Sequence, residues 1–139
     1  MTNADNEAVV LRFYEQMNNE RKLELAPELF TADHTMHDPQ VPVGEGPEAM
    51  AAAVSAMQRG IDAHWTINDI FSAGDRVVVR WTGSGSHIGE VKGISPTGRP
   101  VGPIECNVIH RMADGKIAET WRVWDMLGFL QQIGVVSAK

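Results

Sequence analysis

The sequence predicts a single α+β domain, residues 1–139, in which helices near the start of the chain pack on one face of a curved antiparallel sheet. Three observations support this prediction. A chain of 139 residues has the usual length of one domain. Hydrophobic residues recur at helical spacing up to about residue 60, and beyond it they alternate with polar residues. Helices followed by a run of strands are typical of the α+β class.

The first helix is expected over residues 6–18. Its hydrophobic positions fall on one face, at Val9, Val10, Phe13 and Met17. A shorter helix is expected over residues 23–30, interrupted near Pro27 because proline is tolerated only in a first helical turn. Both segments are therefore expected to cover the sheet.

A third helix is expected over residues 47–60. Pro47 suits a first helical position, and Gly60 is a natural end. Residues 35–38 are expected to be extended, because a residue before proline avoids the helical region and Pro39 follows them.

The remainder of the chain is expected to form an antiparallel meander that ends in a helical turn. The turn residues Gly74-Asp75 and 113–116 each predict a hairpin. The predicted strands are residues 63–73, 76–82, 84–91, 101–112 and 117–125, and the helical turn is residues 126–133.

Composition excludes several classes of function. The net charge is -6 and basic residues are not clustered, which argues against nucleic acid as a partner. Residues 1–8 do not resemble a secretory signal, and no apolar run approaches the length of about 18 residues that a membrane span needs. The single cysteine, Cys106, excludes an intrachain disulfide. We therefore expect a cytoplasmic protein that is not inserted in a membrane.

The last hairpin carries the candidate catalytic residues. Alternation puts Glu119, Trp121 and Asp125 on the face shared with Val108 and His110. If no bulge intervenes, His110 lies opposite Glu119, and Ile104 lies opposite Asp125. An imidazole and two carboxylates on an apolar face suit acid–base chemistry. A structural His110–Glu119 pair and a helix-capping role for Asp125 are the alternatives.

Other polar residues give weaker indications. His34 and His37 are too few for a metal site, which needs at least three protein ligands, so no metal is predicted. Tryptophans such as Trp81 could stack on an aromatic ligand or simply fill the core. On the opposite face of the last strands, Ile109 and Trp124 are expected to point outward and to favour a homodimer or higher homo-oligomer.

Several motifs occur along the chain, and they are most specific in its last third. They are Leu11-Arg12-Phe13-Tyr14-Glu15, His37-Asp38-Pro39, Gly46-Pro47-Glu48, Arg80-Trp81-Thr82-Gly83, Ser86-His87-Ile88-Gly89, Ser95-Pro96-Thr97-Gly98-Arg99, 114–121 and 124–134. With these motifs nearly the whole chain resembles the SnoaL-like polyketide cyclases, or ester cyclases, of the superfamily shaped like nuclear transport factor 2 (NTF2-like).

The resemblance implies a cone-shaped α+β barrel whose apolar pocket closes a ring in a polyketide-like ligand by intramolecular aldol condensation, without metal or cofactor. It implies that Asp125 is the general acid/base and that His110 polarises or orients the substrate. The residues expected to bind the substrate are Phe13, His37, Trp81, His87, Val108, Glu119 and Trp121.

Three other functions remain open from the sequence. A ketosteroid-isomerase-like enzyme needs a tyrosine and a protonated acid, but Phe13 and Val108 fall at those positions, although Asp38 is near the expected base. An epoxide-hydrolase-like enzyme needs an Asp–Arg–Asp group, for which Arg80, Arg111 and Arg122 are available. A binding or dimerisation module without catalysis is the third.

Overall fold

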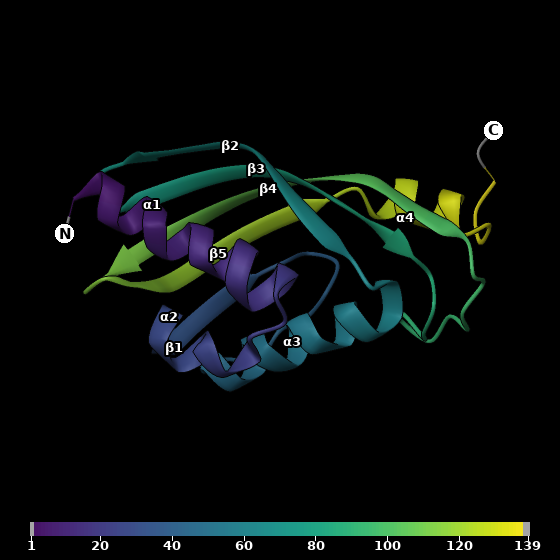
Figure 1. Ribbon diagram of the computed structural model, residues 1–139, viewed down its shortest axis with the longest axis horizontal. Helices are drawn as coiled ribbons and strands as arrows, with labels where there is room; N and C mark the ends of the chain where they lie inside the picture. The colour runs from purple at the N-terminus through teal and green to yellow at the C-terminus, as the bar shows by residue number, and fades with distance from the viewer. Residues whose placement is uncertain (1, 138–139) are drawn as a thin grey trace.

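The structure is a computed structural model that describes residues 2–137, and it has helices packed on one face of a curved, unclosed sheet (Figure 1). The five strands lie in the order β1-β5-β4-β3-β2. The predicted α+β class and the helices on one face are confirmed. The elements are α1 Asn3–Arg12, η1 Phe13–Asn19, η2 Leu23–Leu25, α2 Ala26–Leu29, β1 Phe30–His37, α3 Gly46–Ile61, β2 His64–Ala73, β3 Arg76–Ser86, β4 Pro100–Ala113, β5 Lys116–Trp124 and α4 Met126–Gln132.

The first predicted helix is found, but its second half is a π-helix. A capping box formed by Thr2 and Asp5 begins α1. In the wider turns of η1 two consecutive residues, Phe13 and Tyr14, are both buried. The Asn18 side-chain amide donates to the carbonyl oxygen of Phe13 at 2.8 Å. The π-helix therefore presents two adjacent aromatic rings to the sheet.

The predicted helix over residues 23–30 is shorter than expected, because β1 begins at Phe30. Of the extended piece predicted at residues 35–38, residues 35–37 are the end of this strand. β1 runs parallel to β5, with His37 beside Trp121, whereas the other neighbouring strands are antiparallel. The N-terminal half of the chain thus supplies one edge of the sheet.

The prediction of a separate strand over residues 84–91 is wrong. Ser84 and Ser86 belong to the end of β3, and residues 87–99 form a loop. The amides of Ile88 and Gly89 donate to the carbonyl oxygen of Gly60 near the end of α3. These backbone groups bind the helix end, so they are not available to continue a sheet ladder.

The predicted pairing of the last two strands is also wrong, because a β-bulge lies near their turn. Met112 pairs with Ile117 but Arg111 pairs with Glu119, which leaves Ala118 as an extra residue in β5. His110 consequently lies opposite Thr120 instead of Glu119. The slip moves Glu119, Trp121, Val123 and Asp125 away from the inner face, and brings Thr120, Arg122 and Trp124 onto it.

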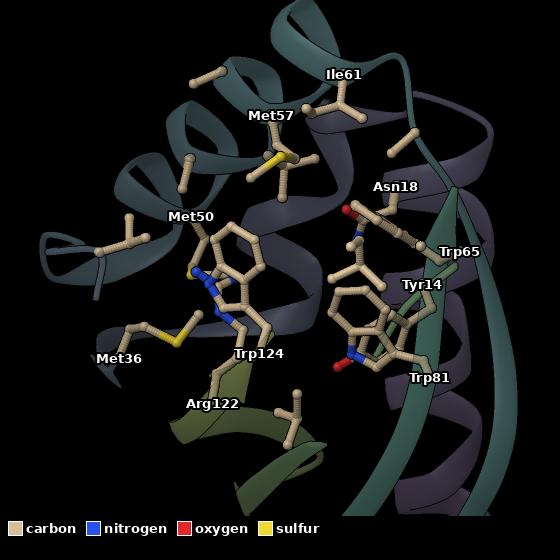
Figure 2. A pocket seen from close by; sticks show the side chains of 18 of the residues that line it. Tyr14, Asn18, Met36, Met50, Met57, Ile61, Trp65, Trp81, Arg122 and Trp124 are labelled. Carbon is tan, nitrogen blue, oxygen red and sulfur yellow. The ribbon is translucent and has the colours of Figure 1, made fainter. Parts of the chain in front are cut away.

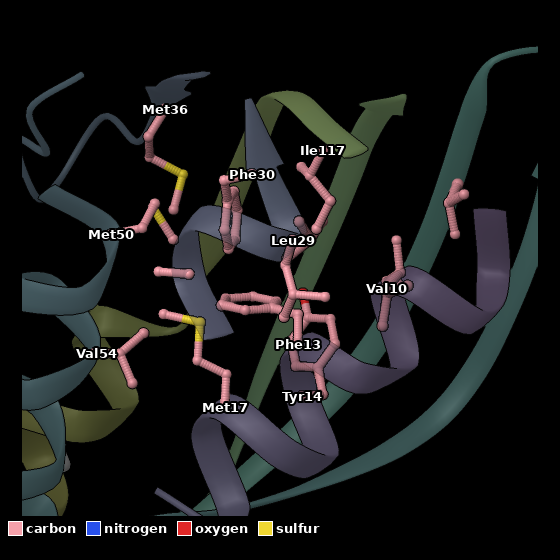
Figure 3. Packing of buried hydrophobic residues seen from close by; sticks show 14 of the residues in the cluster. Val10, Phe13, Tyr14, Met17, Leu29, Phe30, Met36, Met50, Val54 and Ile117 are labelled. Atoms are coloured by element: carbon pink, nitrogen blue, oxygen red, sulfur yellow. The ribbon is translucent and has the colours of Figure 1, made fainter. Parts of the chain in front are cut away.

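The main core lies between the helices and the inner face of the sheet (Figure 3). Phe13 packs edge-on against Tyr14 at 4.8 Å and against Phe30 at 5.0 Å between ring centroids. A second apolar cluster surrounds Phe129 of α4 at the far end of the sheet. In the described part of the chain, no helix has the length and apolar character needed to cross a membrane.

Candidate functional site

A pocket of about 310 Å³ lies between α3, η1 and the inner face of the sheet (Figure 2). This volume is at the lower end of the usual range for small-molecule sites. Its wall is mainly apolar and rich in methionine and tryptophan. The lining residues include Phe13, Tyr14, Met50, Met57, Trp65, Trp81, Glu90, Lys92, Val108, His110, Thr120, Arg122 and Trp124.

Four of the residues predicted to form the site line this pocket. Phe13 comes from η1, Trp81 from β3, and Val108 and His110 from β4. All four are buried. Since β4 alternates its side chains, Val108 and His110 share the inner face as the sequence predicts.

Glu119, Trp121 and His37 lie together on the outer face instead. The His37 ring stacks on Trp121 at 5.3 Å, and its Nε2 lies 2.7 Å from a Glu119 carboxylate oxygen. Arg111 donates to the other Glu119 oxygen at 3.0 Å. The hydrogen bond with His37 and that with Arg111 hold the pKa of Glu119 below its usual value. The prediction that these three residues face the pocket is therefore wrong. The bulge turns Glu119 and Trp121 of β5 outward, and His37 lies beside Trp121 on the neighbouring strand β1.

Asp125 is exposed and caps α4. Its Oδ1 accepts a hydrogen bond from the Gly128 amide at 2.8 Å, as an N-cap residue does. The predicted position of Asp125 opposite Ile104 on the inner face is wrong, because its amide donates to the Glu105 carbonyl oxygen and Ile104 pairs with Gly83. The acid/base role that the family resemblance implies for Asp125 stays a prediction.

His87 is fully buried behind the pocket. Its Nδ1 accepts a hydrogen bond from the Thr97 amide at 3.2 Å, which fixes the fold of the 87–99 loop. Its ring packs edge-on against Phe129, a lining residue, with ring centroids 6.2 Å apart. His87 thus supports the wall without being part of the lining.

A buried chain of hydrogen bonds leads from the pocket across the sheet. The Tyr14 hydroxyl lies 3.0 Å from Nε2 of His110, and Nδ1 of His110 lies 2.9 Å from the hydroxyl of Thr120. That hydroxyl lies 2.9 Å from Nε2 of His34 in β1. His34 points inward and His37 points outward, so the two histidines considered as metal ligands lie on opposite faces of β1.

Burial controls the charge of these groups. It lowers the pKa of His110 to about 3 and that of His34 to about 4, because an imidazolium ion is poorly solvated there. Burial also raises the pKa of Tyr14 well above its usual value, an effect that the positive charge of Arg122 opposes. The chain therefore consists of neutral groups, and each imidazole has one donor and one acceptor nitrogen.

Arg122 provides a fixed positive charge at the pocket. Its Nε donates to Oδ2 of Asp38 at 2.7 Å, and the Asp38 side chain is fully buried. Oδ1 of Asp38 also accepts hydrogen bonds from the Gln40 and Val41 amides at 2.8 and 3.1 Å. Asp38 is therefore fully engaged in holding Arg122, and it is not a free base as the isomerase alternative requires.

Trp81 adds another donor near Tyr14. Its ring lies 5.9 Å from the Tyr14 ring, between centroids, and both residues line the same side of the pocket (Figure 2). Nε1 of Trp81 is buried and makes no hydrogen bond of regular geometry within residues 2–137, but it lies close enough to the Tyr14 hydroxyl to oppose the rise in the Tyr14 pKa. A buried donor of this kind can bind an oxygen atom of a ligand.

Sequence reasoning missed Tyr14, Thr120, Arg122 and His34 as parts of the site. Tyr14 follows Phe13 directly, so a regular helix would not direct both rings inward. Thr120 and Arg122 were missed because the bulge puts them on the inner face. His34 was considered only as a metal ligand. The sequence signal for Tyr14 was its place in an aromatic pair with an asparagine, Asn18, four residues later.

The family model described as SnoaL-like polyketide cyclase matches residues 8–133. No curated protein is significantly similar to the chain in sequence.

Several solved structures have the same fold. TsrD from Streptomyces laurentii is 26% identical, with a TM-score of 0.86 over 98% of this chain and 99% of that chain. IdmH from Streptomyces antibioticus, a proposed polyketide cyclase, is 30% identical, with a TM-score of 0.78 over 93% and 98%. A proposed polyketide cyclase from Bacillus cereus ATCC 10987 is 25% identical, with a TM-score of 0.80 over 96% and 83%. The chain therefore belongs to the SnoaL-like polyketide cyclase family, with an NTF2-like fold.

Proposed function

We propose that this protein closes a ring in a small polyketide-like substrate by an intramolecular aldol reaction. Tyr14 donates a proton to the substrate, and His110 orients the Tyr14 hydroxyl. The observation that carries the proposal is the Tyr14–His110 hydrogen bond of 3.0 Å inside an apolar pocket. In such surroundings a hydrogen bond to a developing charge is stronger than in water. Family membership supports a cyclase-like reaction of this kind.

In the reaction a nucleophilic carbon of the substrate first gives up a proton to water. The resulting carbanion attacks a ketone carbon of the same molecule, a carbon–carbon bond forms, and the carbonyl electron pair moves onto oxygen. Tyr14 binds that oxygen and transfers its hydroxyl proton to the alkoxide, which is a far stronger base than a phenolate. Tyr14 regains a proton from water when the product leaves, so the reaction needs no net proton.

His110 enables this transfer by controlling the direction in which Tyr14 donates. If Nε2 of His110 carries the proton, it donates to the Tyr14 oxygen and frees the Tyr14 hydroxyl for the substrate. Thr120 then donates to Nδ1 of His110 and accepts from Nε2 of His34, so all three bonds of the chain remain formed. The same Nε2 proton and the charge of Arg122 stabilise the transient phenolate.

A matched pair of variants tests the assignment. We expect His110→Gln to lower turnover by about 10²-fold, because the amide cannot hold the Tyr14 oxygen in the same way. Asp125→Asn keeps the cap on α4 and should leave turnover near the wild-type rate. Polyketide methyl esters that contain a ketone and an acidic carbon are screened first with the wild type, and product formation is followed by chromatography.

The opposite result would assign the acid/base role to Asp125. Loss of turnover in a folded Asp125→Asn variant, with His110→Gln active, contradicts the proposal. Circular dichroism and ligand titration of both variants show whether an effect on turnover comes from the chemistry or from the fold.

Copies of the chain are proposed to pair through the outer face of the sheet. Strand register places Phe71, Val78, Ile109 and Trp121 in one row across four strands. Phe71 is 57% exposed and Ile109 38% exposed. Trp124, which the sequence assigned to this face, lines the pocket instead. Light scattering at micromolar concentration should report a dimer that Ile109→Asp weakens, and a wild-type monomer would refute the pairing.

A further inference from the structure

The pocket has hydrogen-bonding groups on two sides, and in the proposed ring closure only one side donates a hydrogen bond to the substrate. Tyr14 and Trp81 lie on one side, and Arg122 extends from β5 on the other (Figure 2). A substrate that closes a ring has two reacting ends, a nucleophile and a carbonyl. Tyr14 binds the carbonyl end, which leaves Arg122 available to bind the other end.

Arg122 is held in a way that leaves its outer edge available. Its Nε donates to one carboxylate oxygen of Asp38, and the other Asp38 oxygen accepts hydrogen bonds from two backbone amides. The two terminal nitrogens of Arg122 have no hydrogen-bond partner within residues 2–137. The side chain is 21% exposed and lines the pocket, so the donors on these nitrogens can reach a ligand.

The geometry points to a ligand with two coplanar oxygens. A guanidinium group binds such pairs through two parallel hydrogen bonds, most strongly when negative charge is spread over both oxygens. A single ketone offers only one acceptor. A carboxylate also fits, but it has no acidic carbon that could act as the nucleophile of an aldol reaction.

We infer that Arg122 binds a 1,3-dicarbonyl group of the substrate as its delocalised enolate, and so selects the nucleophilic end of the molecule. This inference rests on the proposed function, because it gives that enolate carbon the role of attacking the carbonyl bound by Tyr14. The carbon between the two carbonyls loses one proton to water, and its charge is shared by two oxygens at Arg122. The substrate class is therefore a small aromatic or polyketide-like 1,3-diketone or 3-oxo ester.

The charged side chains at the pocket balance one another. Lys92 and Glu90 both line the pocket, and Lys92 donates to the Gln40 carbonyl oxygen at 2.7 Å. With the Arg122–Asp38 pair, the four side chains contribute two positive and two negative charges. Selectivity therefore has to come from the directed donors of Arg122 instead of from a net positive charge.

A matched pair of small probes tests the inference without any turnover. Benzoylacetone has two carbonyls in 1,3 positions, and butyrophenone has the same aromatic end with one carbonyl. We expect the wild type to bind benzoylacetone at least 10-fold more tightly in isothermal titration calorimetry at pH 7. The ultraviolet absorption of the bound diketone should shift to that of the enolate, at a pH where free diketone is largely protonated.

Two variants assign this preference to Arg122. Arg122→Lys keeps the charge and a partner for Asp38 but loses the planar fork, and it should lower the affinity for benzoylacetone about 10-fold and leave butyrophenone unchanged. A double variant, Asp38→Asn with Arg122→Gln, removes both charges together, which avoids an unpaired buried carboxylate. It should abolish the enolate absorption.

Equal binding of the two probes by the wild type, or bound diketone with the absorption of the neutral form, would overturn the inference even if no variant folds. These readings are independent of the proposed ring closure. If the enolate is bound and His110→Gln has normal turnover, the proposed function fails and the Arg122 site stands. If ring closure depends on His110 but the probes bind equally, only the Arg122 assignment fails.

Discussion

Replacing Tyr14 with phenylalanine is expected to lower kcat for ring closure by about 10²–10³-fold, with little change in KM, because the hydroxyl acts mainly on the charge that develops during the reaction. The ring stays, so the aromatic contacts of Tyr14 with Phe13 and Trp81 are kept. The measurement is steady-state turnover of the polyketide ester identified with the wild type.

The stability of this variant separates chemistry from packing. Loss of the hydroxyl leaves Nε2 of His110 without its partner, which costs about 1–3 kcal/mol and should not unfold the protein. His64→Gln, at an exposed histidine in β2, is the control and should match the wild type. A folded Tyr14→Phe variant with wild-type kcat would show that the Tyr14–His110 pair is structural.

The protein is expected to lose about 4 kcal/mol of unfolding free energy between pH 7 and pH 5, about 2 kcal/mol from each of His34 and His110. Burial lowers the pKa of His34 to about 4 and that of His110 to about 3, from the usual value of 6.5. Below pH 6.5 the unfolded chain takes up protons that the folded chain does not. The stability present above the unfolded pKa is therefore lost as the pH falls toward the folded values.

Urea unfolding at pH 7 and pH 5 measures this loss. His64→Gln should show the wild-type difference, whereas His34→Gln should lower it by about half, because one of the two buried imidazoles is removed. The pKa of Glu119 is lowered from 4.5, so this carboxyl group changes the unfolding free energy mainly below pH 5. Equal stability at both pH values would mean that the two histidines are accessible to water or that their protonated forms are stabilised in the folded protein.

The helices and the antiparallel meander could be predicted from local patterns. The spacing of Val10, Phe13 and Met17, and the alternation along β3 and β4, report directly which side of an element is buried. For the same reason, Val108 and His110 were correctly assigned to the inner face. Alternation fails at an irregularity such as the bulge in β5. The segment that contains Val91 was predicted as a strand, but it is a loop, because amides of this segment donate to a carbonyl oxygen at the end of α3 instead of to a neighbouring strand.

The sequence by itself determined the α+β class, the resemblance to the family, and the inward histidine of β4. Only the tertiary structure decided which polar residues accompany that histidine. One extra residue, Ala118, reverses the face of every later side chain in β5, because side chains alternate with a period of two. The π-helix brings Tyr14 inward, and the parallel pairing of β1 with β5 brings His34 and Asp38 to Thr120 and Arg122. Such contacts join segments about 80 to 100 residues apart, which no local pattern in one sequence reports.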